Sequence, residues 1–557
     1  MHNDKAGQIK LTNKSPSQTT RPIKTVKVIK APCRREKHGL RLSLQVDTIL
    51  VLDFGGQYCH LIARRMRENH VSSEIVTHDI SLNEIKTWQQ KVRVKGLVLS
   101  GGPQSVIEPD ALGIDTGILD LDIPILGLCY GHQLLAHATG GLVRTAKKKE
   151  FGIAIAAIDK PVGVLKGLDC MEKVWMSHSD TVCELPDDFE ILAHTANSPI
   201  AAFRHRKLPI YGLQWHPEVV HTQKGYKMLK NFLFEVCKCQ TNWTMENFIE
   251  KAVEETKRAI GEAKAIVALS GGIDSSTATA IAARAIGKNL TAVFVDHGFM
   301  RQNETQFVME TFQELDANLV CVDAKQRFMT KLKDVTNPEK KRKIIGEEFV
   351  RVFEEEAEKV GAKYLLQGTI YPDRIESGFQ RFSEKIKTHH NVVGLPTRME
   401  FKAIVEPLRN LYKDEVRQVA EKLGLPNQIV ERQPFPGPGL AVRIVGELTQ
   451  ERVETVRKAD KIVAEEIEST GLRNRLWQYF AVLTSTKTTG VKGDTGAYGG
   501  TIVVRVVESK EAMTASFAQI PYEVLERISS RITNELPTIT RVVYDITNKP
   551  PATIEWE

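Results

Sequence analysis

The sequence contains few cysteines and no long apolar run. Its eight cysteines are scattered over 557 residues without repeated Cys-x-x-Cys pairs, which excludes a disulfide scaffold or a zinc ribbon and favours a reducing compartment. No apolar stretch approaches the roughly 18–20 residues that a membrane-spanning helix needs, and the N-terminus lacks a signal-peptide core. We therefore expect a cytoplasmic protein without a membrane partner.

The composition is otherwise that of a folded globular protein. Hydrophobic residues make up 42% and charged residues 26%, with 38 glycines and 23 prolines, which excludes a disordered or a collagenous chain. At roughly 100–200 residues per domain, a chain of this length holds about three to five domains.

The positive net charge belongs to an N-terminal tail. Before residue 46, eleven Lys and Arg residues face only Asp4 and Glu36, and this +9 exceeds the +7 of the whole chain, so the rest carries −2. The folded body therefore gives no ground for expecting nucleic-acid binding. Residues 1–46 are expected to be a disordered tail. Its composition fits a solvated extension, an organelle-targeting segment or a polyanion contact.

Short apolar runs that end in Gly or Ser and lead into helical periodicity begin at residue 47. This rhythm predicts an α/β fold in which mostly parallel strands bring their carboxyl ends, and hence the ligand sites, to one edge. In a first domain, residues 47–240, strands are predicted over 48–53, 96–100, 123–128, 153–158, 173–176 and 209–214, and a helix over 225–237.

A second α/β domain, residues 241–432, is predicted from a helix over 246–260 and strands over 264–269, 292–296, 319–323 and 363–368. The stretch 433–440 holds three prolines and two glycines and predicts a rigid joint. Beyond it, helices over 448–469 and 522–536 and strands over 501–507 and 541–545 predict a smaller α+β domain, residues 433–557. The fold class is thus two consecutive mostly parallel-sheet α/β domains followed by a small α+β C-terminal domain.

Cys129 stands between a predicted buried strand and a helix, with Gly127 and Gly131 on either side. This is the sequence form of a nucleophile elbow, in which small residues permit a sharp turn and the helix N-terminus activates the thiol and offers N–H donors to an oxyanion. His216 follows another strand end and is the candidate base, with Glu218 to orient and charge the imidazole. Each residue alone also fits an ordinary buried cysteine or loop histidine, but together their contexts favour a catalytic pair.

Gly-x-Cys-x-Gly-x-Gln combined with His-Pro-Glu resembles the class I glutamine amidotransferases over residues 47–240. The resemblance implies hydrolysis of glutamine through a thioester on Cys129, with release of ammonia. It further implies an oxyanion hole and glutamine pocket formed by Gly102, Tyr130, Gln133, His178 and Asp180. In one departure, Gly56 replaces the serine usual in related synthases, and we expect the effect to be small because glycine suits the same turn.

A second motif, Ser270-Gly271-Gly272-Ile273-Asp274-Ser275-Ser276, follows a predicted strand and opens a helix. Its glycines let backbone N–H groups approach phosphate oxygens, its hydroxyls add donors, and the helix N-terminus favours an anion. The motif lacks the Gly-Lys-Ser/Thr of a Walker A loop and resembles the ATP pyrophosphatase loop, which implies attack at the α-phosphate of ATP. Asp274 is a candidate Mg²⁺ ligand or simply a first-turn acid, and Asp296 ends the next strand, where it can meet the ATP ribose or the metal.

The chain after the tail resembles the GMP synthetase family, most specifically in its final segment, Lys-Pro-Pro-Ala-Thr-Ile-Glu-Trp-Glu. The resemblance implies that ATP adenylates XMP at its C2 oxygen and that ammonia then displaces AMP. It implies a lid whose contacts come from Asp373, Lys387, His389 and His390, although residue chemistry alone also fits a solvated loop there.

The family match assigns the XMP site to Arg342, Gly437, Pro438, Gln478, Asp494, Arg541, Lys549 and Glu555. The cations among them suit a 5′-phosphate and the others polar contacts to the nucleotide. As alternatives, Arg342 lies in a basic run over 340–343 that also fits a solvated face, and Lys549 fits an ordinary terminal charge. In a second departure, Gly496 stands where the family usually has arginine.

Three functions are compatible with these motifs: this ligase, another ATP pyrophosphatase amidotransferase with a different carbonyl acceptor, or a non-catalytic binding protein. The C-terminal segment favours the first, and the intact Cys129, His216 and phosphate loop argue against the third. CTP synthetase would place its amidotransferase domain last. The resemblance implies glutamine, ATP and XMP as substrates, Mg²⁺ as cofactor, and a homodimer formed through the C-terminal domain.

Overall fold

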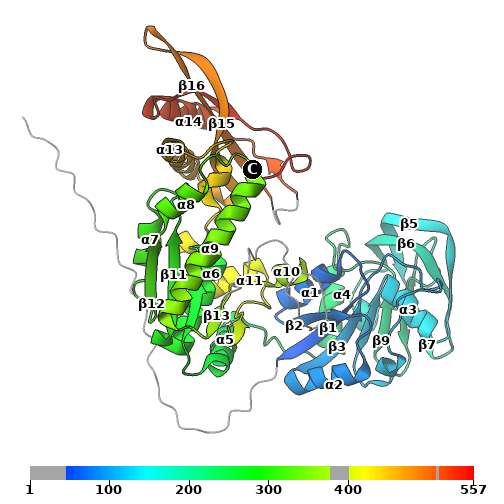
Figure 1. Ribbon diagram of the computed structural model, residues 1–557. Coiled ribbons are helices and arrows are strands. Elements are labelled where there is room, and N and C mark those ends of the chain that lie inside the picture. The colour runs from blue at the N-terminus through cyan, green and yellow to red at the C-terminus, as the bar shows by residue number, and fades with distance from the viewer. Residues whose placement is uncertain (1–45, 377–400, 510–513) are drawn as a thin grey trace, which may run out of the picture. The chain divides into compact units, whose positions relative to one another are not determined.

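A computed structural model describes residues 46–376, 401–509 and 514–557. Within them the chain forms three β-sheets in sequence order, two of which are flanked by helices in the α/β manner (Figure 1). No helix among the described residues is long and apolar enough to cross a membrane. The order and flanking helices of the three sheets confirm the expected fold class.

The first sheet runs from residue 47 to residue 213 in the strand order β2-β1-β3-β4-β9-β8-β7-β5-β6. Its first five strands are parallel: β1 (Asp47–Asp53), β2 (Ser72–Thr77), β3 (Arg93–Leu99), β4 (Ile125–Leu128) and β9 (Ile210–Leu213). An antiparallel extension follows, made of β5 (Leu142–Ile158), β6 (Met171–Glu184), β7 (Phe189–His194) and β8 (Ala202–His205).

Alternating side chains of β1 divide the first domain's core into two layers. Ile49 and Val51 pack on one face with α1 (Cys59–Glu68), α4 (Gly225–Lys230) and the π-helix η3 (Asn231–Val236). Leu50 and Leu52 pack on the other with α2 (Leu82–Lys91), α3 (Tyr130–Ala138) and the 3₁₀ turn η1 (Thr116–Asp120). The short turn η2 (Gly163–Leu165) follows β5. Both faces are covered, as expected where parallel strands read as continuous apolar runs.

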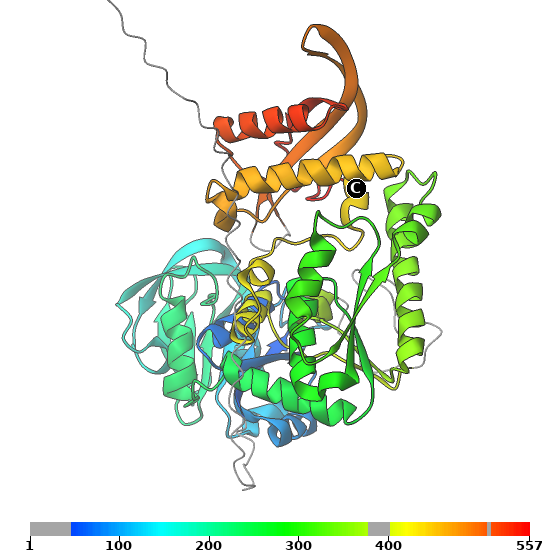
Figure 2. The same ribbon diagram turned by 90° about the vertical axis from the view of Figure 1, so that its left-hand side faces the viewer.

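The second sheet is entirely parallel, in the order β12-β11-β10-β13-β14. Its strands are β10 (Ala265–Ala268), β11 (Leu290–Asp296), β12 (Asn318–Asp323), β13 (Tyr364–Leu366) and β14 (Ala403–Val405). Figure 2 shows this sheet and its helices from a second direction. The first layer of helices is α5 (Met245–Ile260), α6 (Ile273–Ile286), α7 (Glu304–Phe312), α11 (Lys413–Lys422) and α12 (Asn427–Val430).

On the opposite face of this sheet lie α8 (Lys325–Lys331) and α9 (Pro338–Val360). The turn η4 (Gly287–Asn289) follows α6, and α10 (Tyr371–Glu376) follows β13. The apolar layer beneath α8 and α9 continues into the C-terminal domain, because Val293 and Phe328 belong to the same buried cluster as Ile444 and Val504. The second and third domains therefore share a core.

The C-terminal domain carries a long two-stranded ribbon, β15 (Gln478–Lys492) and β16 (Thr495–Glu508), with β17 (Ser516–Phe517) and β18 (Ile539–Tyr544) beside β16. Helices α13 (Gln450–Glu468) and α14 (Tyr522–Glu535) pack on it, and the turns η5 (Gly439–Arg443) and η6 (Leu472–Arg475) flank α13. This is the predicted α+β arrangement, with η5 starting inside the proline-rich joint.

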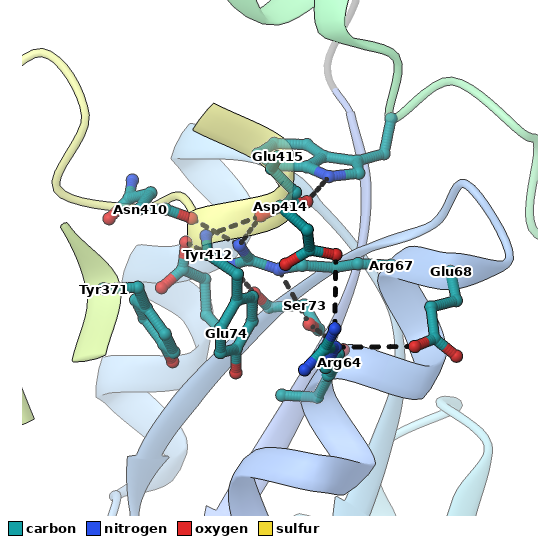
Figure 3. Close-up of polar contacts among 12 residues, drawn as sticks. Arg64, Arg67, Glu68, Ser73, Glu74, Tyr371, Asn410, Tyr412, Asp414 and Glu415 are labelled. Carbon is teal, nitrogen blue, oxygen red and sulfur yellow. Dashed lines mark hydrogen bonds and ion pairs between the residues drawn. The ribbon is translucent and has the colours of Figure 1, made fainter. Parts of the chain in front are cut away.

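A buried arginine of the first domain binds residues of the second. Arg67, on α1, donates from Nη1 to Oε2 of Glu415 over 3.1 Å, and its guanidinium carbon lies 5.0–5.2 Å from the ring centres of Trp243, Tyr371 and Tyr412 (Figure 3). Trp243 donates to the other oxygen of Glu415 over 2.7 Å. The Arg67 cluster therefore joins α1 to the start of α11 through a charge pair shielded from water.

Candidate active sites

Cys129 occupies a strained turn between β4 and α3. Its φ is 53° and its ψ −104°, a region that non-glycine residues seldom adopt and that is found where function requires it. The turn packs tightly, since a Cβ on Gly131 would lie 2.4 Å from the carbonyl oxygen of Leu99. The strand, turn and helix have the geometry expected of a nucleophile elbow, and the thiol lies 3.5 Å from the carbonyl oxygen of Ser177.

His216 is paired with Glu218 as expected. Its Nδ1 lies 2.7 Å from Oε1 of Glu218, and both residues are buried. Burial alone lowers the pKa of His216, but the Glu218 carboxylate and the hydrogen bond with Cys129 outweigh burial and raise that pKa to about 11. The imidazole is therefore protonated at neutral pH, and the three side chains form a Cys-His-Glu unit.

Three residues that belong to no catalytic motif of the sequence hold His216 in place. The Thr222 hydroxyl donates to the carbonyl oxygen of His216 over 2.6 Å and accepts from the N–H of Trp175 over 3.0 Å. Tyr58 sets its ring edge-on to the imidazole, with 5.1 Å between the ring centres. Contacts like these fix the orientation of a histidine side chain, and no local sequence motif indicates them.

The loop over residues 100–103 lies beside the thiol. A Cβ on Gly101 would fall 3.6 Å from Cβ of Cys129 and 3.0 Å from Cε1 of His216, so this backbone borders both side chains of the candidate site. Gly102 follows it and packs against Phe54 and Tyr130. The departure at Gly56 lies at the same place, because a Cβ there would meet the carbonyl oxygen of Gly101 at only 2.2 Å.

Three of the four remaining residues assigned to the glutamine pocket, Gln133, His178 and Asp180, form one hydrogen-bonded group. Gln133 donates to the carbonyl oxygen of Asp180 over 2.8 Å, and Nδ1 of His178 lies 2.8 Å from the same oxygen. Nε2 of His178 lies 3.2 Å from Glu150. Glu150 is buried, but it directly follows three lysines in the sequence and so resembled a surface residue. Burial lowers the pKa of His178. Tyr130 differs, because its hydroxyl donates to Leu112 over 2.7 Å.

The phosphate motif forms a loop closed by its own hydroxyls. Ser270 and Ser275 place their Oγ atoms 2.9 Å apart, and Ser275 also donates to the carbonyl oxygen of Gly272 over 3.1 Å. Helix α6 starts at Ile273, and the buried Ser276 hydroxyl has no hydrogen-bond partner among the described residues. Arg432 donates to the carbonyl oxygen of Gly271 over 2.9 Å and so braces the loop from outside.

Asp274 faces a lysine that the sequence analysis did not select. Its Oδ2 lies 2.5 Å from Nζ of Lys413, while Oδ1 is buried and accepts no hydrogen bond from the described residues. Asp296 uses its oxygens locally, accepting from Thr305 over 2.7 Å and from the N–H of Gly298 over 3.0 Å. Burial raises the pKa of Asp296, but these hydrogen bonds and Lys325 lower it overall.

Of the four residues assigned to the lid, the structure describes only Asp373. Asp373 accepts a hydrogen bond from the N–H of Ile370 over 3.1 Å and lies in the first turn of α10. The other three assigned residues, Lys387, His389 and His390, lie outside the described residues.

Two of the residues assigned to XMP meet around an arginine that the sequence analysis missed. Gln478 donates to Oε1 of Glu555 over 3.0 Å and to the carbonyl oxygen of Pro434 over 3.0 Å. Arg443 is fully buried and donates two hydrogen bonds to the Glu555 carboxylate, over 3.0 and 3.1 Å. Arg443 sits in an apolar stretch, so nothing in the sequence distinguished it from core.

The basic run over 340–343 is not a solvated face throughout. Lys341 is fully buried and donates to the carbonyl oxygen of Ile444 over 2.6 Å and to the Glu557 carboxylate over 2.5 Å. Burial lowers its pKa. Arg342 is half exposed and donates to the backbone oxygen of Glu557. The solvated-face interpretation is therefore wrong for Lys341, and the run holds the C-terminal segment.

The other assigned XMP residues are dispersed. A Cβ on Gly437 would meet nothing within 4 Å, Pro438 precedes η5, and Lys549 pairs its backbone with Ala515. Arg541 is exposed on β18, opposite Thr501. Asp494 stands at the tip of the ribbon, about 45 Å along β15 from Gln478 at the usual rise per residue. Within one chain, Asp494 and Gln478 are not brought together.

Family models match the chain in three consecutive parts. "Glutamine amidotransferase class-I" matches residues 50–236, "PP-loop domain" matches residues 242–427, and "GMP synthase C terminal domain" matches residues 465–556. The first contains Cys129 and His216, and the second contains the phosphate loop. The third contains Gln478 and Glu555.

Whole-length relatives carry one name. The chain is 52% identical over 518 residues to "GMP synthase [glutamine-hydrolyzing]" of Caldanaerobacter subterraneus subsp. tengcongensis, covering 93% of this chain and 100% of the relative. It is 51% identical over 516 residues to the protein of the same name in Caldicellulosiruptor saccharolyticus, covering 92% and 100%. Among solved structures, a putative GMP synthase subunit from Thermoplasma acidophilum is 36% identical over 35% of this chain and 94% of its own, with a TM-score of 0.32.

Proposed function

Because this chain belongs to the family of glutamine-hydrolysing GMP synthases, we propose that its two active centres lie at Cys129 and at the phosphate loop over residues 270–276. The family's reaction is a carbon–nitrogen ligation that takes its nitrogen from glutamine. The observation that carries the assignment is the strained Cys129 turn set against the buried His216–Glu218 pair. The folding of the sheet alone does not require a strained cysteine next to a buried histidine–glutamate pair.

At the first centre, the Cys129 thiolate attacks the side-chain carbonyl carbon of glutamine. The carbonyl oxygen becomes an oxyanion that backbone N–H groups near Gly102 and at the start of α3 can stabilise. The protonated His216 gives its proton to the leaving ammonia, and Glu218 holds the imidazole for this transfer. A water molecule then cleaves the thioester, which yields glutamate and frees the thiol.

At the second centre, the C2 oxygen of XMP attacks the α-phosphorus of ATP and pyrophosphate leaves. The loop amides, the Ser270 and Ser275 hydroxyls and the N-terminus of α6 are suited to hold the departing phosphates. Ammonia then attacks C2 of the adenylated XMP and AMP departs, so the nitrogen released at Cys129 ends in GMP.

Mg²⁺ is the metal we propose for the ATP. The described residues contain no group of three or more His, Cys, Asp or Glu side chains that could hold a metal ion by themselves. A single carboxylate plus phosphate oxygens and water suits Mg²⁺, however, and the unpartnered Oδ1 of Asp274 fits that role. The ion would neutralise charge on the phosphates as pyrophosphate departs.

GMP formation from XMP and Mg-ATP tests both centres, with glutamine or ammonium as nitrogen donor. The Cys129→Ala variant should lose glutamine-driven synthesis and keep ammonium-driven synthesis. Lys422→Met, a surface change on α11, serves as the matched control and should keep both. If the intact protein makes no GMP with either donor, the acceptor is another carbonyl compound.

We also propose that the two centres are coupled, so that glutaminase activity stays low until XMP and ATP are bound. The buried Arg67–Glu415 contact supports this, because α1 begins next to Tyr58 and α11 begins with Lys413, which faces Asp274. Glutamate release should be measured with and without both nucleotides. Full turnover in their absence would contradict the coupling.

A homodimer formed through the C-terminal domain is proposed as well. Apolar side chains are exposed there, with Tyr522 at 87%, Ile546 at 66% and Val543 at 40%. A cleft of about 370 Å³ beside them is lined by Leu525, Val542 and Tyr544. Light scattering should give twice the chain mass, and Tyr522→Asp should lower it. A monomer at micromolar concentration would refute the proposal.

We propose domain limits near residues 47, 241 and 433. The three regions that the family models match support this division. A cytoplasmic location is supported by the cysteines of the described residues, all seven of which are free. Limited proteolysis and cell fractionation test these two points.

A further inference from the structure

Arg301 is a buried cation with two guanidinium nitrogens that lack a hydrogen-bond partner among the described residues. It lies between β11 and α7, and its side chain is only 16% exposed. Its Nε and Nη2 atoms are shielded from solvent and donate to no group among the described residues. The nearest acid is Asp460, whose Oδ2 is 3.8 Å from Nε, beyond hydrogen-bonding distance. Leaving guanidinium donors unpaired in the interior is costly, so the arrangement calls for an explanation.

Arg301 shares its nearby acid, Asp460, with Arg443. Arg443 lies against the same Phe435 ring, and it donates one hydrogen bond of 3.1 Å to Asp460 in addition to its two to Glu555. Burial lowers the pKa of Arg301 to about 10, and Arg443 and Arg432 act in the same direction although Asp460 opposes them. Glu304 also opposes them, but Arg432 and Arg443 already pair with Glu304, Asp460 and Glu555, so an anion that bound Nε and Nη2 of Arg301 directly would be stabilised by its charge.

Arg301 also lies between the phosphate loop and the acceptor residues. On one side, Arg432 connects Gly271 of the loop to Glu304, whose N–H bonds to the carbonyl oxygen of Arg301 over 3.3 Å. On the other side, the Arg301 guanidinium carbon lies 4.3 Å from the ring centre of Phe435, within the proline-rich joint. Pro434 of that joint accepts from Gln478. Arg301 is thus linked through Glu304 and Arg432 to the phosphate loop, and through Phe435 to the joint that carries a contact of Gln478.

We propose that Arg301 is a catalytic residue that binds the α-phosphate of ATP while the adenylyl group passes to XMP. In that step the acceptor oxygen forms a bond to the α-phosphorus, and the bond from the α-phosphorus to the bridging oxygen breaks. Its electron pair leaves with pyrophosphate. The planar guanidinium offers paired N–H donors that match two phosphate oxygens, which a lysine does not. This inference rests on the proposed assignment of the two loops.

A packing role for Arg301 makes a different prediction. If stacking on Phe435 were its only purpose, removing the ring would harm the protein as much as removing the charge. If the free donors bind phosphate, removing the ring should lower the exchange rate much less than removing the charge does. Phe435→Leu therefore serves as the matched control, because it removes the ring and keeps the guanidinium.

The experiment measures XMP-dependent exchange of labelled pyrophosphate into ATP, using the full chain with saturating XMP and Mg-ATP. Arg301→Gln should lower the exchange rate by about 100-fold or more, the usual cost of removing a donor to transition-state charge. The loss should fall on the rate, with little change in the KM for XMP, and glutaminase activity should persist. Phe435→Leu should cost less than about ten-fold. A loss below about five-fold in Arg301→Gln, or an equal loss in Phe435→Leu, would overturn the proposal.

A second variant covers the case in which Arg301→Gln does not fold. Arg301→Lys keeps the buried charge, and a loss of about ten-fold or more in exchange supports recognition by the guanidinium fork. An unchanged rate would overturn it. Absence of exchange in the unsubstituted protein would overturn the acceptor assignment together with this proposal, whereas exchange that survives in both variants would overturn this proposal alone.

Discussion

Nζ of Lys413 lies 2.5 Å from Oδ2 of Asp274, so a helix that starts far along the chain supplies a cation to the phosphate loop. The pair leaves Oδ1 of Asp274 free for a metal and places a positive charge where ATP phosphates are expected. We predict that Lys413→Met raises the KM for Mg-ATP by about ten-fold, the worth of one charge-assisted hydrogen bond. Steady-state ammonium-driven GMP synthesis measures it.

The control is Lys422→Met on the same helix, whose lysine pairs with Glu246 at the surface. Exposed pairs contribute little, so this variant should change the KM by less than about two-fold. Equal effects in both variants would show that Lys413 acts through the helix rather than on the nucleotide.

Arg67 should matter to stability far more than its neighbour Arg64 does. The Arg67 side chain is 2% exposed and bonds to Glu415 over 3.1 Å, whereas Arg64 is 35% exposed and lies 3.4 Å from Asp414. Removing one partner of a buried pair strands the other charge and costs about 3–5 kcal/mol, while an exposed pair contributes about 0–1 kcal/mol. Arg67→Met should therefore lower the denaturation midpoint clearly, and Arg64→Met barely.

Denaturant unfolding followed by tryptophan fluorescence measures both variants, since Trp243 lies in the Arg67 cluster. If Arg64→Met lost as much stability as Arg67→Met, burial would not be the deciding factor.

The parts of the fold that sequence predicted were those with strong local patterns. The buried run over 48–53 became β1, and the amphipathic helix over 246–260 became α5 almost to the residue. The helix predicted over 225–237 was interrupted, because α4 passes into a π-helix at Asn231. Strands β2, β7, β8, β14 and β17 were missed because they are short and their place depends on neighbours in the sheet, and the longer β15 was missed because its second half is rich in polar residues.

The candidate sites divided in the same way. Cys129, His216 and Asp274 lie in contiguous motifs that encode a turn or a loop, so they could be selected from sequence. Glu150 and Lys413 lie in charged runs that resemble any solvated surface, and only the fold brings them to their partners. Pairing across the chain depends on sheet order and helix packing, which no local pattern records.

The close approach at Gly56 yields a test of the oxyanion loop. A Cβ there would meet the carbonyl oxygen of Gly101 at 2.2 Å, and backbone atoms cannot rotate away as a side chain can. Serine is nevertheless usual at this position in related synthases, so we expect the two loops to shift enough to admit the Cβ, and Gly56→Ser should keep glutaminase activity close to that of the intact protein. Ammonium-driven synthesis should be unchanged.

Gly113→Ser is the control, because a Cβ at Gly113 meets nothing within 4 Å. It should leave both activities as they are. A loss of about ten-fold or more in Gly56→Ser would mean that in this chain the two loops cannot separate without displacing the groups around Cys129.

Glu218→Gln should convert a pH-insensitive imidazole into a pH-sensitive one. The pKa of His216 is raised to about 11 against an unfolded value of about 6.5, so in the intact protein His216 keeps its proton between these limits. The stability that its pairing contributes is fully present below pH 6.5 and is lost as pH rises through about 11. Without the carboxylate the pKa falls, and the proton is lost near neutral pH.

Glutaminase activity of Glu218→Gln should therefore drop by about 10²–10⁴-fold at pH 7, as when the acid of a catalytic triad is replaced, and should vary with pH where the intact protein does not. The profile should be measured from pH 6 to pH 9 with both nucleotides present. Glu150→Gln is the matched control, because Glu150 pairs with His178 rather than with His216 and its loss should not introduce a new titration. Identical profiles for Glu218→Gln and the intact protein would mean that Glu218 does not set the charge of His216.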